Sequence, residues 1–170
     1  ELDERNAALL WVDPDSGEHG VLARGVRNSF DGVWLDGVGY LFSDNGRDWE
    51  GDHPPEEMNL LSEGADYGWP DDDPDHPVPS GTVGPIATWT SDSRLNGLPV
   101  RPSESSCPGG EFGVYGTVFG SWNSVTPVGH EIVRMDFRAN SSAAQGWGAN
   151  ISCFAEDLVT PLRLGFRPSG

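Results

Sequence analysis

The chain has 170 residues, about the length of one domain, which is enough to bury a hydrophobic core. Its formal net charge is -17, and each of its 10 Lys or Arg residues is an arginine. This balance argues against binding to nucleic acid or to an anionic membrane surface, because both need a basic face. No apolar run approaches the ~18–20 residues of a membrane span, and the acidity is compatible with a protein that holds calcium.

The first part of the chain predicts two β-hairpins. The 23 Gly, 14 Pro and 7 Trp favour many short strands joined by tight turns over helices. Apolar runs at 7–12 and 20–23 flank turn-forming residues at 13–17, which predicts the first hairpin. Apolar runs on both sides of Asp36-Gly37 predict the second, because Asp-Gly is a strong hairpin signal.

An acidic stretch rich in Gly and Pro follows at 44–70, DNGRDWEGDHPPEEMNLLSEGADYGWP. The one convincing helical signal of the chain lies inside it, at 55–61. Glu56 and Glu57 fall in the first turn of that predicted helix, where carboxylates suit the helix dipole. Most of the other acidic side chains are interpreted as solvated charge.

The rest of the chain predicts further strands and no helix. Residues 71–110 are rich in Pro, Asp and Ser and predict a long surface insertion, with one strand at 86–89. Three more strands are predicted at 114–119, 131–137 and 162–166.

Weak internal repetition suggests how these strands are organised. Residues 160–170 echo 28–37, each with a polar or Pro start, an apolar strand and a Gly turn. Strand–turn repeats without helices predict an all-β fold that is part of a β-propeller. At roughly 40–50 residues a blade, 1–170 forms one partial propeller domain of about two to three blades, with its ring not closed. We interpret the chain as a fragment of a longer protein.

The cysteines and two glycosylation sequons favour an extracytoplasmic location. Cys107 and Cys153 are the only cysteines, and they form either a disulfide or two buried thiols. Asn140-Ser141-Ser142 and Asn150-Ile151-Ser152 both fit the N-glycosylation pattern. We therefore expect a secreted glycoprotein, extracellular or periplasmic.

Four sequence words in order resemble the glucose/sorbosone dehydrogenase family, the soluble quinoproteins that use pyrroloquinoline quinone (PQQ). They are VRNSF (26–30), DNGRD (44–48), PPEEMN (54–59) and GADYGWP (64–70). A later segment, FGSWNSVTPVGHEIVRMDF (119–137), is similar to the family's HGSWNR…P…G…VVR pattern. The resemblance covers roughly 20–170.

This resemblance implies a six-bladed propeller that binds PQQ over its central axis, with calcium beside the quinone. It further implies hydride transfer from an aldose or sorbosone-type sugar to the quinone, and an external electron acceptor. Calcium prefers hard oxygen ligands, backbone carbonyls included, and acts on a quinone oxygen as a Lewis acid. The carboxylates of the cofactor suit bidentate pairing with arginine.

Three residues correspond to cofactor contacts by resemblance. Arg27 would bind a cofactor carboxylate, Asn28 would hydrogen-bond the cofactor, and Arg163 aligns loosely with a further contact. The alternative for Arg27 is a surface ion pair at a strand end. Trp69 and Trp122 are interpreted as blade packing, with sugar stacking as the alternative.

Four residues correspond to calcium ligands by resemblance. The backbone carbonyls of Gly46 and Arg47 would hold the calcium beside the cofactor, and Gly46 suits a carbonyl that must turn toward an ion. Glu57 and the carbonyl of Tyr67 would hold a second, structural calcium. The alternative for Glu57 is a carboxylate at a helix start.

The chain departs from the family pattern at several positions. Phe119 stands where the family has His, Ser124 where it often has Arg, and Ser29 where it has Pro. Lysine, a cofactor contact in some members, is absent. None of the four histidines stands where the catalytic base is expected, so we expect that base upstream of this chain and no activity from the fragment alone.

Two other functions stay open. One is a non-catalytic propeller, braced by calcium, that binds a protein or glycan partner, since propellers host many functions. The other is a hydrolase propeller of the lactonase type, which shares the metal but is not supported by the four words.

Overall fold

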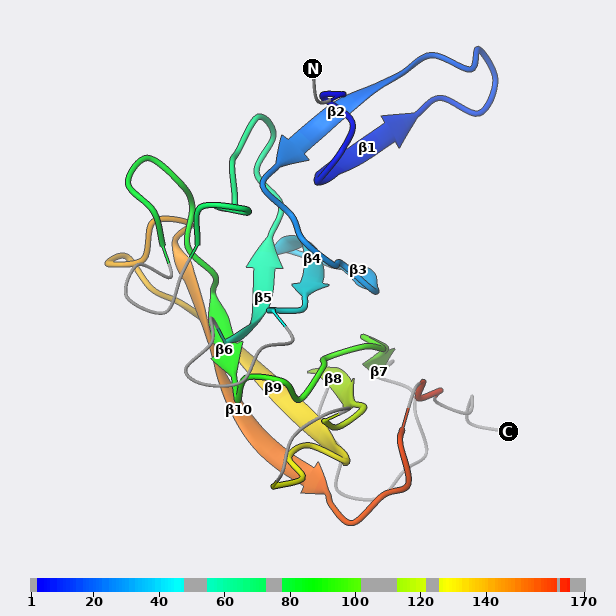
Figure 1. Ribbon diagram of the computed structural model, residues 1–170, viewed down its shortest axis with the longest axis vertical. Coiled ribbons are helices and arrows are strands. Elements are labelled where there is room, and N and C mark those ends of the chain that lie inside the picture. Colours follow the sequence, from blue (N-terminus) through cyan, green and yellow to red (C-terminus); the bar gives the residue numbers. More distant parts are fainter. Residues whose placement is uncertain are drawn as a thin grey trace.

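The computed structural model describes residues 3–47, 55–72, 78–101, 113–121, 126–161 and 163–165. All regular structure in these residues is β-strand (Figure 1). No helix that could cross a membrane, by its length and apolar character, occurs in these residues. The strands are β1 (Ala8–Val12), β2 (His19–Arg24), β3 (Gly32–Leu35), β4 (Gly39–Asp44), β5 (Glu56–Leu60), β6 (Ala87–Trp89), β7 (Val100–Arg101), β8 (Gly113–Val118), β9 (Glu131–Ala139) and β10 (Trp147–Ala155).

The strands form three antiparallel sheets, and no ring closes among them (Figure 1). β1 and β2 form a hairpin that extends from one end of the molecule. The middle sheet has the order β3-β4-β5-β6, and the second four-stranded sheet has the order β7-β8-β9-β10. Neighbours in each sheet are consecutive in the chain, as in the blades of a propeller. The predicted all-β fold with an open ring is confirmed.

The turns follow the residues that predicted them. β3 and β4 are joined through Asp36 and Gly37, and the amide of Val38 donates a hydrogen bond to the carbonyl of Leu35 at 3.0 Å. Gly37 has a φ of +79°, which glycine adopts at little cost. Both predicted hairpins are confirmed.

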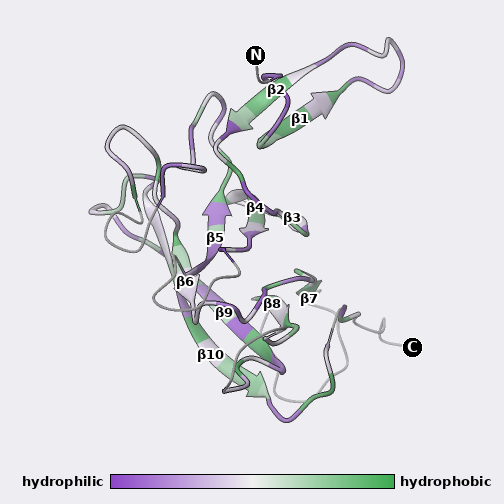
Figure 2. Ribbon diagram, viewed as in Figure 1, coloured by the Kyte–Doolittle hydropathy of each residue, from purple (hydrophilic) through white to green (hydrophobic). Residues whose placement is uncertain are grey.

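The middle sheet is covered on both faces. One face packs against the second sheet through Leu41, Met58 and Leu60, which join Val114 and Val133 in the larger core. The other face packs toward the β1–β2 hairpin in a smaller core of Ala23, Val26, Phe42 and Tyr67. Figure 2 shows apolar residues on strands of all three sheets.

The predicted helix at 55–61 is wrong, because these residues form β5. β5 pairs with β4 on one side and with β6 on the other, so both of its edges are hydrogen-bonded. Its side chains also alternate: Glu56, Met58 and Leu60 face the second sheet, and Glu57 and Asn59 face the opposite way. Tertiary pairing thus overrides a weak local helical signal.

The other predicted strands have mixed outcomes. Those at 86–89, 114–119 and 131–137 are confirmed as β6, β8 and β9. β10, which pairs along β9, was not predicted. Residues 163–165, the described part of the strand predicted at 162–166, form no strand.

Two sequence expectations are not settled by the fold. The division into one domain with an insertion at 71–110 stays a prediction, although the described part of that segment supplies Leu95 and Leu98 to the larger core. The Cys107–Cys153 disulfide also stays a prediction, because Cys107 lies outside the described residues. Cys153 is exposed and has no disulfide partner among the residues that the structure describes.

Candidate functional site

Three segments far apart in the sequence meet at the end of the middle sheet where β4 stops and β5 starts. Between them lies a small polar pocket with a volume of about 10 Å³. This is about the room that one water molecule occupies. The residues that line it are Gly25, Arg27, Asp44, Asn45, Gly46, Pro55, Glu57, Tyr67, Trp69 and Asp72.

The segment that carries Arg27 is fixed to the loop after β5 at Gly25. The carbonyl of Gly25 accepts a hydrogen bond from the amide of Trp69 at 3.0 Å, and the preceding carbonyl, of Arg24, accepts one from the amide of Tyr67 at 2.9 Å. Gly25 has a φ of +71°, and a Cβ there would lie 2.6 Å from the amide nitrogen of Gly68. Only glycine fits this close contact.

Asp44, the last residue of β4, anchors the same segment from the other side. Its Oδ2 accepts the amide of Arg27 at 2.9 Å, and its Oδ1 accepts the amide of Asn28 at 2.6 Å. The carbonyl of Asn28 in turn accepts the amide of Asn45 at 3.2 Å. These bonds explain why a carboxylate stands at a position that is only 6% exposed.

Two guanidinium groups lie against the ring of Trp69. That of Arg47 is 4.7 Å from the ring centroid and that of Arg27 is 5.6 Å from it, both within cation–π range. Arg27 Nη1 donates to the carbonyl of Asn45 at 2.9 Å and also to the carbonyl of Gly46. The indole of Trp69 therefore contacts both guanidinium groups beside the 44–47 loop.

Arg47 is engaged by the loop that follows Trp69. Its Nη2 donates to the carbonyls of Pro70 and Asp72 at 2.6 and 2.7 Å. The same nitrogen lies 3.4 Å from Asp72 Oδ1. Arg47 therefore ties residues 70–72 to the end of β4.

Two carboxylates face each other across the strand ladder beside the pocket. Asp44 and Glu57 are direct cross-strand partners of β4 and β5, so their side chains project from the same face. Burial raises the pKa of Asp44 to about 6. Burial, together with the charges of Asp44 and Asp72, raises the pKa of Glu57 to about 7.

The donor set at this place suits a hard cation. Two neighbouring carboxylates with like charge are unfavourable unless a cation or a proton offsets them. Asn45 Oδ1 and Asn59 Oδ1 are buried and accept no hydrogen bond from the residues that the structure describes. Oxygens of carboxylates, amides and carbonyls are the ligands that calcium prefers, so the residues fit calcium. Among the described residues, however, no three His, Cys, Asp or Glu side chains form a group that could bind a metal without other donors.

The structure brings five of the seven site residues predicted from the sequence to one place. Arg27, Gly46, Glu57 and Tyr67 line the pocket, and Arg47 lies against Trp69 beside it. Their roles as ligands stay predictions.

Asn28 and Arg163 are placed differently. Asn28 is exposed and is tied to the site through its backbone amide, which donates to Asp44. Arg163 is exposed and does not line the pocket.

Sequence reasoning did not assign Asp44, Asp72 or the role of Trp69. For Asp44 a signal was present: it follows Phe42 at the strand period of two, so it belongs to the face that buries Phe42. For Asp72 and Trp69 the signal is absent, because their contacts depend on how residues 69–72 turn back toward β4.

Phe119, one of the positions that depart from the family pattern, does not line this pocket. Phe119 directly follows β8, and its amide donates to the carbonyl of Arg94 at 2.9 Å. Ser124 and Trp122 lie outside the described residues. Of the described histidines, His19 is exposed in β2, and His130 lies against Gly120.

No protein-family model matches the chain, and no curated protein matches it. Solved structures do match. The PQQ-bound aldose sugar dehydrogenase from Streptomyces coelicolor is 23% identical, covering 85% of this chain and 35% of that chain, with a TM-score of 0.54. An oxidoreductase of Thermus thermophilus, described as a glucose dehydrogenase, is 16% identical, covering 84% of this chain and 37% of that chain, with a TM-score of 0.60. The holo PQQ domain of pyranose dehydrogenase from Coprinopsis cinerea is 16% identical, covering 87% and 44%, with a TM-score of 0.51.

These likenesses show the fold. The chain folds as part of a β-propeller of the kind found in PQQ-dependent sugar dehydrogenases, as the four sequence words predicted. It spans between 35% and 44% of the length of these three structures.

Proposed function

We propose that the chain is part of a PQQ-dependent sugar dehydrogenase, an oxidoreductase that oxidises an aldose or a sorbosone-type sugar. The observation that carries this proposal is the convergence of residues from the four sequence words. Residues 27, 46, 57 and 67 are far apart in the sequence and line one pocket. The fold that brings them together is also the fold of quinone-bound sugar dehydrogenases.

The role of the chain is to bind and orient the cofactor. PQQ, when bound, supplies the hydride acceptor, and the protein supplies its placement and electrostatics. Arg27 would pair with a carboxylate of the cofactor, and its guanidinium is already aligned by Trp69 and by two carbonyls. Asn28 and Arg163 would add contacts, as the resemblance implies. The base that takes the sugar hydroxyl proton belongs to a part of the protein upstream of this chain.

Calcium is proposed as the second cofactor, at two positions. The carbonyls of Gly46 and Arg47 would hold the ion beside the quinone. Glu57 and the carbonyl of Tyr67 would hold a structural ion, and Asp44 is the cross-strand neighbour that adds negative charge there. The pairing of the Asp44 and Glu57 carboxylates across the strand ladder supports a cation at this place, because a cation would offset both charges.

The test is binding and turnover with the full-length protein. PQQ is titrated with and without calcium, followed by its absorbance, and dye-linked oxidation is measured over a panel of aldoses. Arg27→Ala should weaken PQQ binding by about tenfold or more, because it removes charge-assisted hydrogen bonds. Arg24→Ala is the matched control, since Arg24 is exposed and pairs with Glu4. Absence of both PQQ binding and turnover in the wild-type protein would overturn the proposal.

The alternative is a non-catalytic propeller that calcium braces and that binds a protein or glycan partner. The observation that favours it concerns Arg27. Its guanidinium already donates hydrogen bonds to the carbonyls of Asn45 and Gly46, so it has a structural role without a cofactor. A rise in melting temperature with calcium, together with no PQQ binding, would select this alternative.

We also propose that the protein works outside the cytoplasm and passes its electrons to an external acceptor. Both sequon asparagines, Asn140 and Asn150, are exposed, so a glycan could be attached at either. Cell fractionation tests the location, and a shift in mass after deglycosylation tests the modification. A protein found only in the cytoplasm would contradict this proposal.

A further inference from the structure

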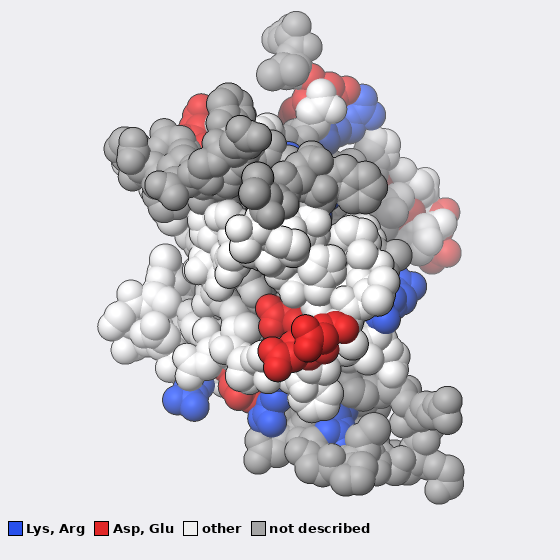
Figure 3. All heavy atoms as spheres, turned by 60° about the horizontal axis from the view of Figure 1, so that its bottom comes forward, with Lys and Arg blue, Asp and Glu red and all other residues white. Residues whose placement is uncertain are grey.

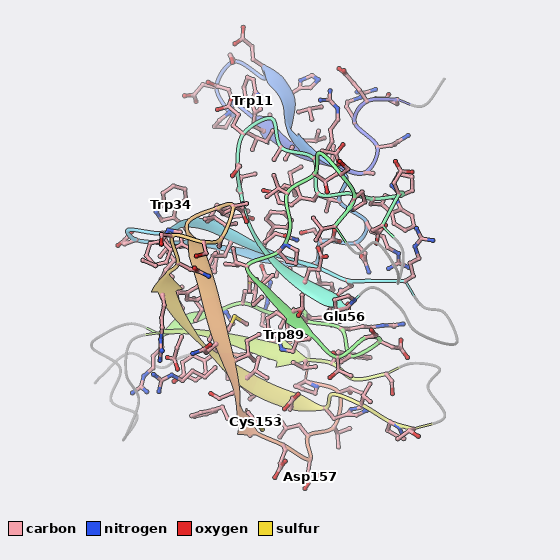
Figure 4. All side chains as sticks on the ribbon, turned by 90° about the vertical axis from the view of Figure 1, so that its left-hand side faces the viewer. Trp11, Trp34, Glu56, Trp89, Cys153 and Asp157 are labelled. Carbon is pink, nitrogen blue, oxygen red and sulfur yellow. The ribbon has the colours of Figure 1, made fainter. Side chains whose placement is uncertain are left out.

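Glu56 is a buried carboxylate on the apolar face of the middle sheet. It is 1% exposed and shares its strand face with Met58 and Leu60. Its cross-strand partner is Trp89 of β6, and Figure 4 labels both residues near the end of the sheet where β5 begins. Burying a carboxylate among apolar side chains costs free energy unless hydrogen bonds compensate. The hydrogen bonds of Glu56 therefore indicate its role.

Both oxygens of Glu56 accept backbone amides from two different segments. Oε2 accepts the amide of Gly46 at 2.8 Å. Oε1 accepts the amide of Arg94 at 3.2 Å. Gly46 lines the pocket, whereas Arg94 belongs to the connection between β6 and β7. One side chain therefore joins the pocket loop to a segment 38 residues later in the chain than Glu56 itself.

The Arg94 end of this connection is itself fixed to the second sheet. The carbonyl of Arg94 accepts the amide of Phe119, and the carbonyl of Ser93 accepts the amide of Gly120, at 2.9 and 2.8 Å. Leu95 forms an isolated bridge with Val118 of β8. A continuous path of hydrogen bonds thus runs from Gly46 through Glu56 and Arg94 to the end of β8.

We propose that Glu56 is a positioning residue for the candidate site. Through the amide of Gly46 it fixes the Asn45–Gly46 peptide, and so the position of the residue whose carbonyl is a proposed calcium ligand, relative to the second sheet. This inference rests on the proposed function. It adds to that function a residue that acts on the ligand only through Gly46. The two neighbouring glutamates then have different roles. Glu57 lines the pocket, whereas Glu56 lies on the opposite face of the sheet and bonds to the amide of Gly46.

The test compares two variants that each remove one buried side-chain acceptor of a backbone amide. Glu56→Gln keeps the size of the side chain but replaces one acceptor oxygen by a donor, so one of the two amides is left unpaired. Thr117→Val is the matched control, because Thr117 Oγ1 is buried and accepts the amide of Gly97 at 2.8 Å without contacting the pocket. Both variants should lower the melting temperature of the full-length protein.

Only Glu56→Gln should change the site. We expect PQQ to bind at least tenfold more weakly in the presence of calcium, and the amides of residues 45–47 to exchange hydrogen at least tenfold faster. For Thr117→Val, both quantities should stay within threefold of wild type. Equal effects of the two variants on PQQ binding and on exchange would overturn the inference. If Glu56→Gln does not fold, Glu56→Met, which has similar volume and no buried polar group, replaces it.

The experiment separates this inference from the proposed function. If wild-type protein binds no PQQ, the proposed function fails, and the exchange rates at 45–47 then decide the role of Glu56. Faster exchange in Glu56→Gln alone would still support the positioning role, and unchanged exchange would overturn it.

Discussion

The two faces of the middle sheet differ in chemistry although the same strands build both. On one face, Leu41, Met58 and Leu60 pack against the second sheet in a continuous apolar core. On the other, Phe42 and Tyr67 meet edge to face at 5.1 Å, and the row ends in the carboxylates of Asp44 and Glu57. The first face stabilises the fold, and the second tolerates unfavourable charge at its end, which is typical of a binding site.

The largest expected effect tests the apolar face. Met58→Ala should lower the free energy of unfolding by about 2–5 kcal/mol, because Met58 is fully buried between the two sheets. Trp34→Ala, on a strand of the same sheet, should change it by less than about 1 kcal/mol, since Trp34 is 66% exposed. Urea denaturation followed by fluorescence measures both, and equal losses would contradict the assignment of the core.

The next effect tests the backbone contact beside the pocket. Gly25→Ala should cost about 2–4 kcal/mol, because it combines a positive φ with a Cβ only 2.6 Å from the amide of Gly68. Gly37→Ala is the matched control: its φ is also positive, at +79°, but a Cβ there meets nothing within 4 Å. We expect about 1 kcal/mol for the control. Thermal unfolding of the two variants distinguishes strain alone from strain with a clash.

A smaller effect concerns pH and the charged face. The folded protein keeps protons on Asp44 up to about pH 6 and on Glu57 up to about pH 7, whereas the unfolded chain releases them near pH 4 to 4.5. The folded state therefore binds more protons in this window, and the free energy of unfolding falls as the pH rises through it. Without divalent cations, we expect a loss on the order of 1–3 kcal/mol between pH 4 and pH 8. Denaturation in a chelator at constant ionic strength checks this, and stability that rises over this range would contradict it.

The smallest effect compares the loss of a carboxylate beside the pocket with the loss of an exposed carboxylate. Glu57→Gln should stabilise the metal-free protein at pH 8 by about 1 kcal/mol, because it removes a buried charge that faces Asp44. The same variant should lose most of the rise in melting temperature that calcium produces in the wild type. Glu63→Gln, at an exposed position, should show neither change. A calcium response that survives in Glu57→Gln would place the ion elsewhere.

Much of the fold could be predicted from the sequence because its signals are local. Turn residues such as Asp36 and Gly37 mark the hairpins, and runs that contain β-branched and aromatic residues mark β8 and β9. β5 was mistaken for a helix because Pro55 and two glutamates resemble a helix start, whereas the strand depends on pairing with β4 and β6. β10 was missed because its residues are mostly small or polar and are held by β9.

The site could be predicted only where its residues belong to sequence motifs. Motif words locate residues that a family shares, so Arg27, Gly46, Glu57 and Tyr67 were found together. The contacts of Glu56 cross from one sheet to the other and leave no periodic or motif signal. Acidic side chains also gather outside any motif: Figure 3 shows a group of them near the middle of the face in view.

The alternation of side chains along β5 has a consequence for how this protein can change in evolution. Glu56 and Glu57 are chemically identical neighbours, yet they serve opposite faces of one sheet. A single residue inserted or deleted immediately before β5 would shift its register and exchange the faces of every side chain in the strand. It would place the pocket acid in the core and a core side chain in the pocket. Lineages that keep the site should therefore vary the identity of these residues more readily than their spacing.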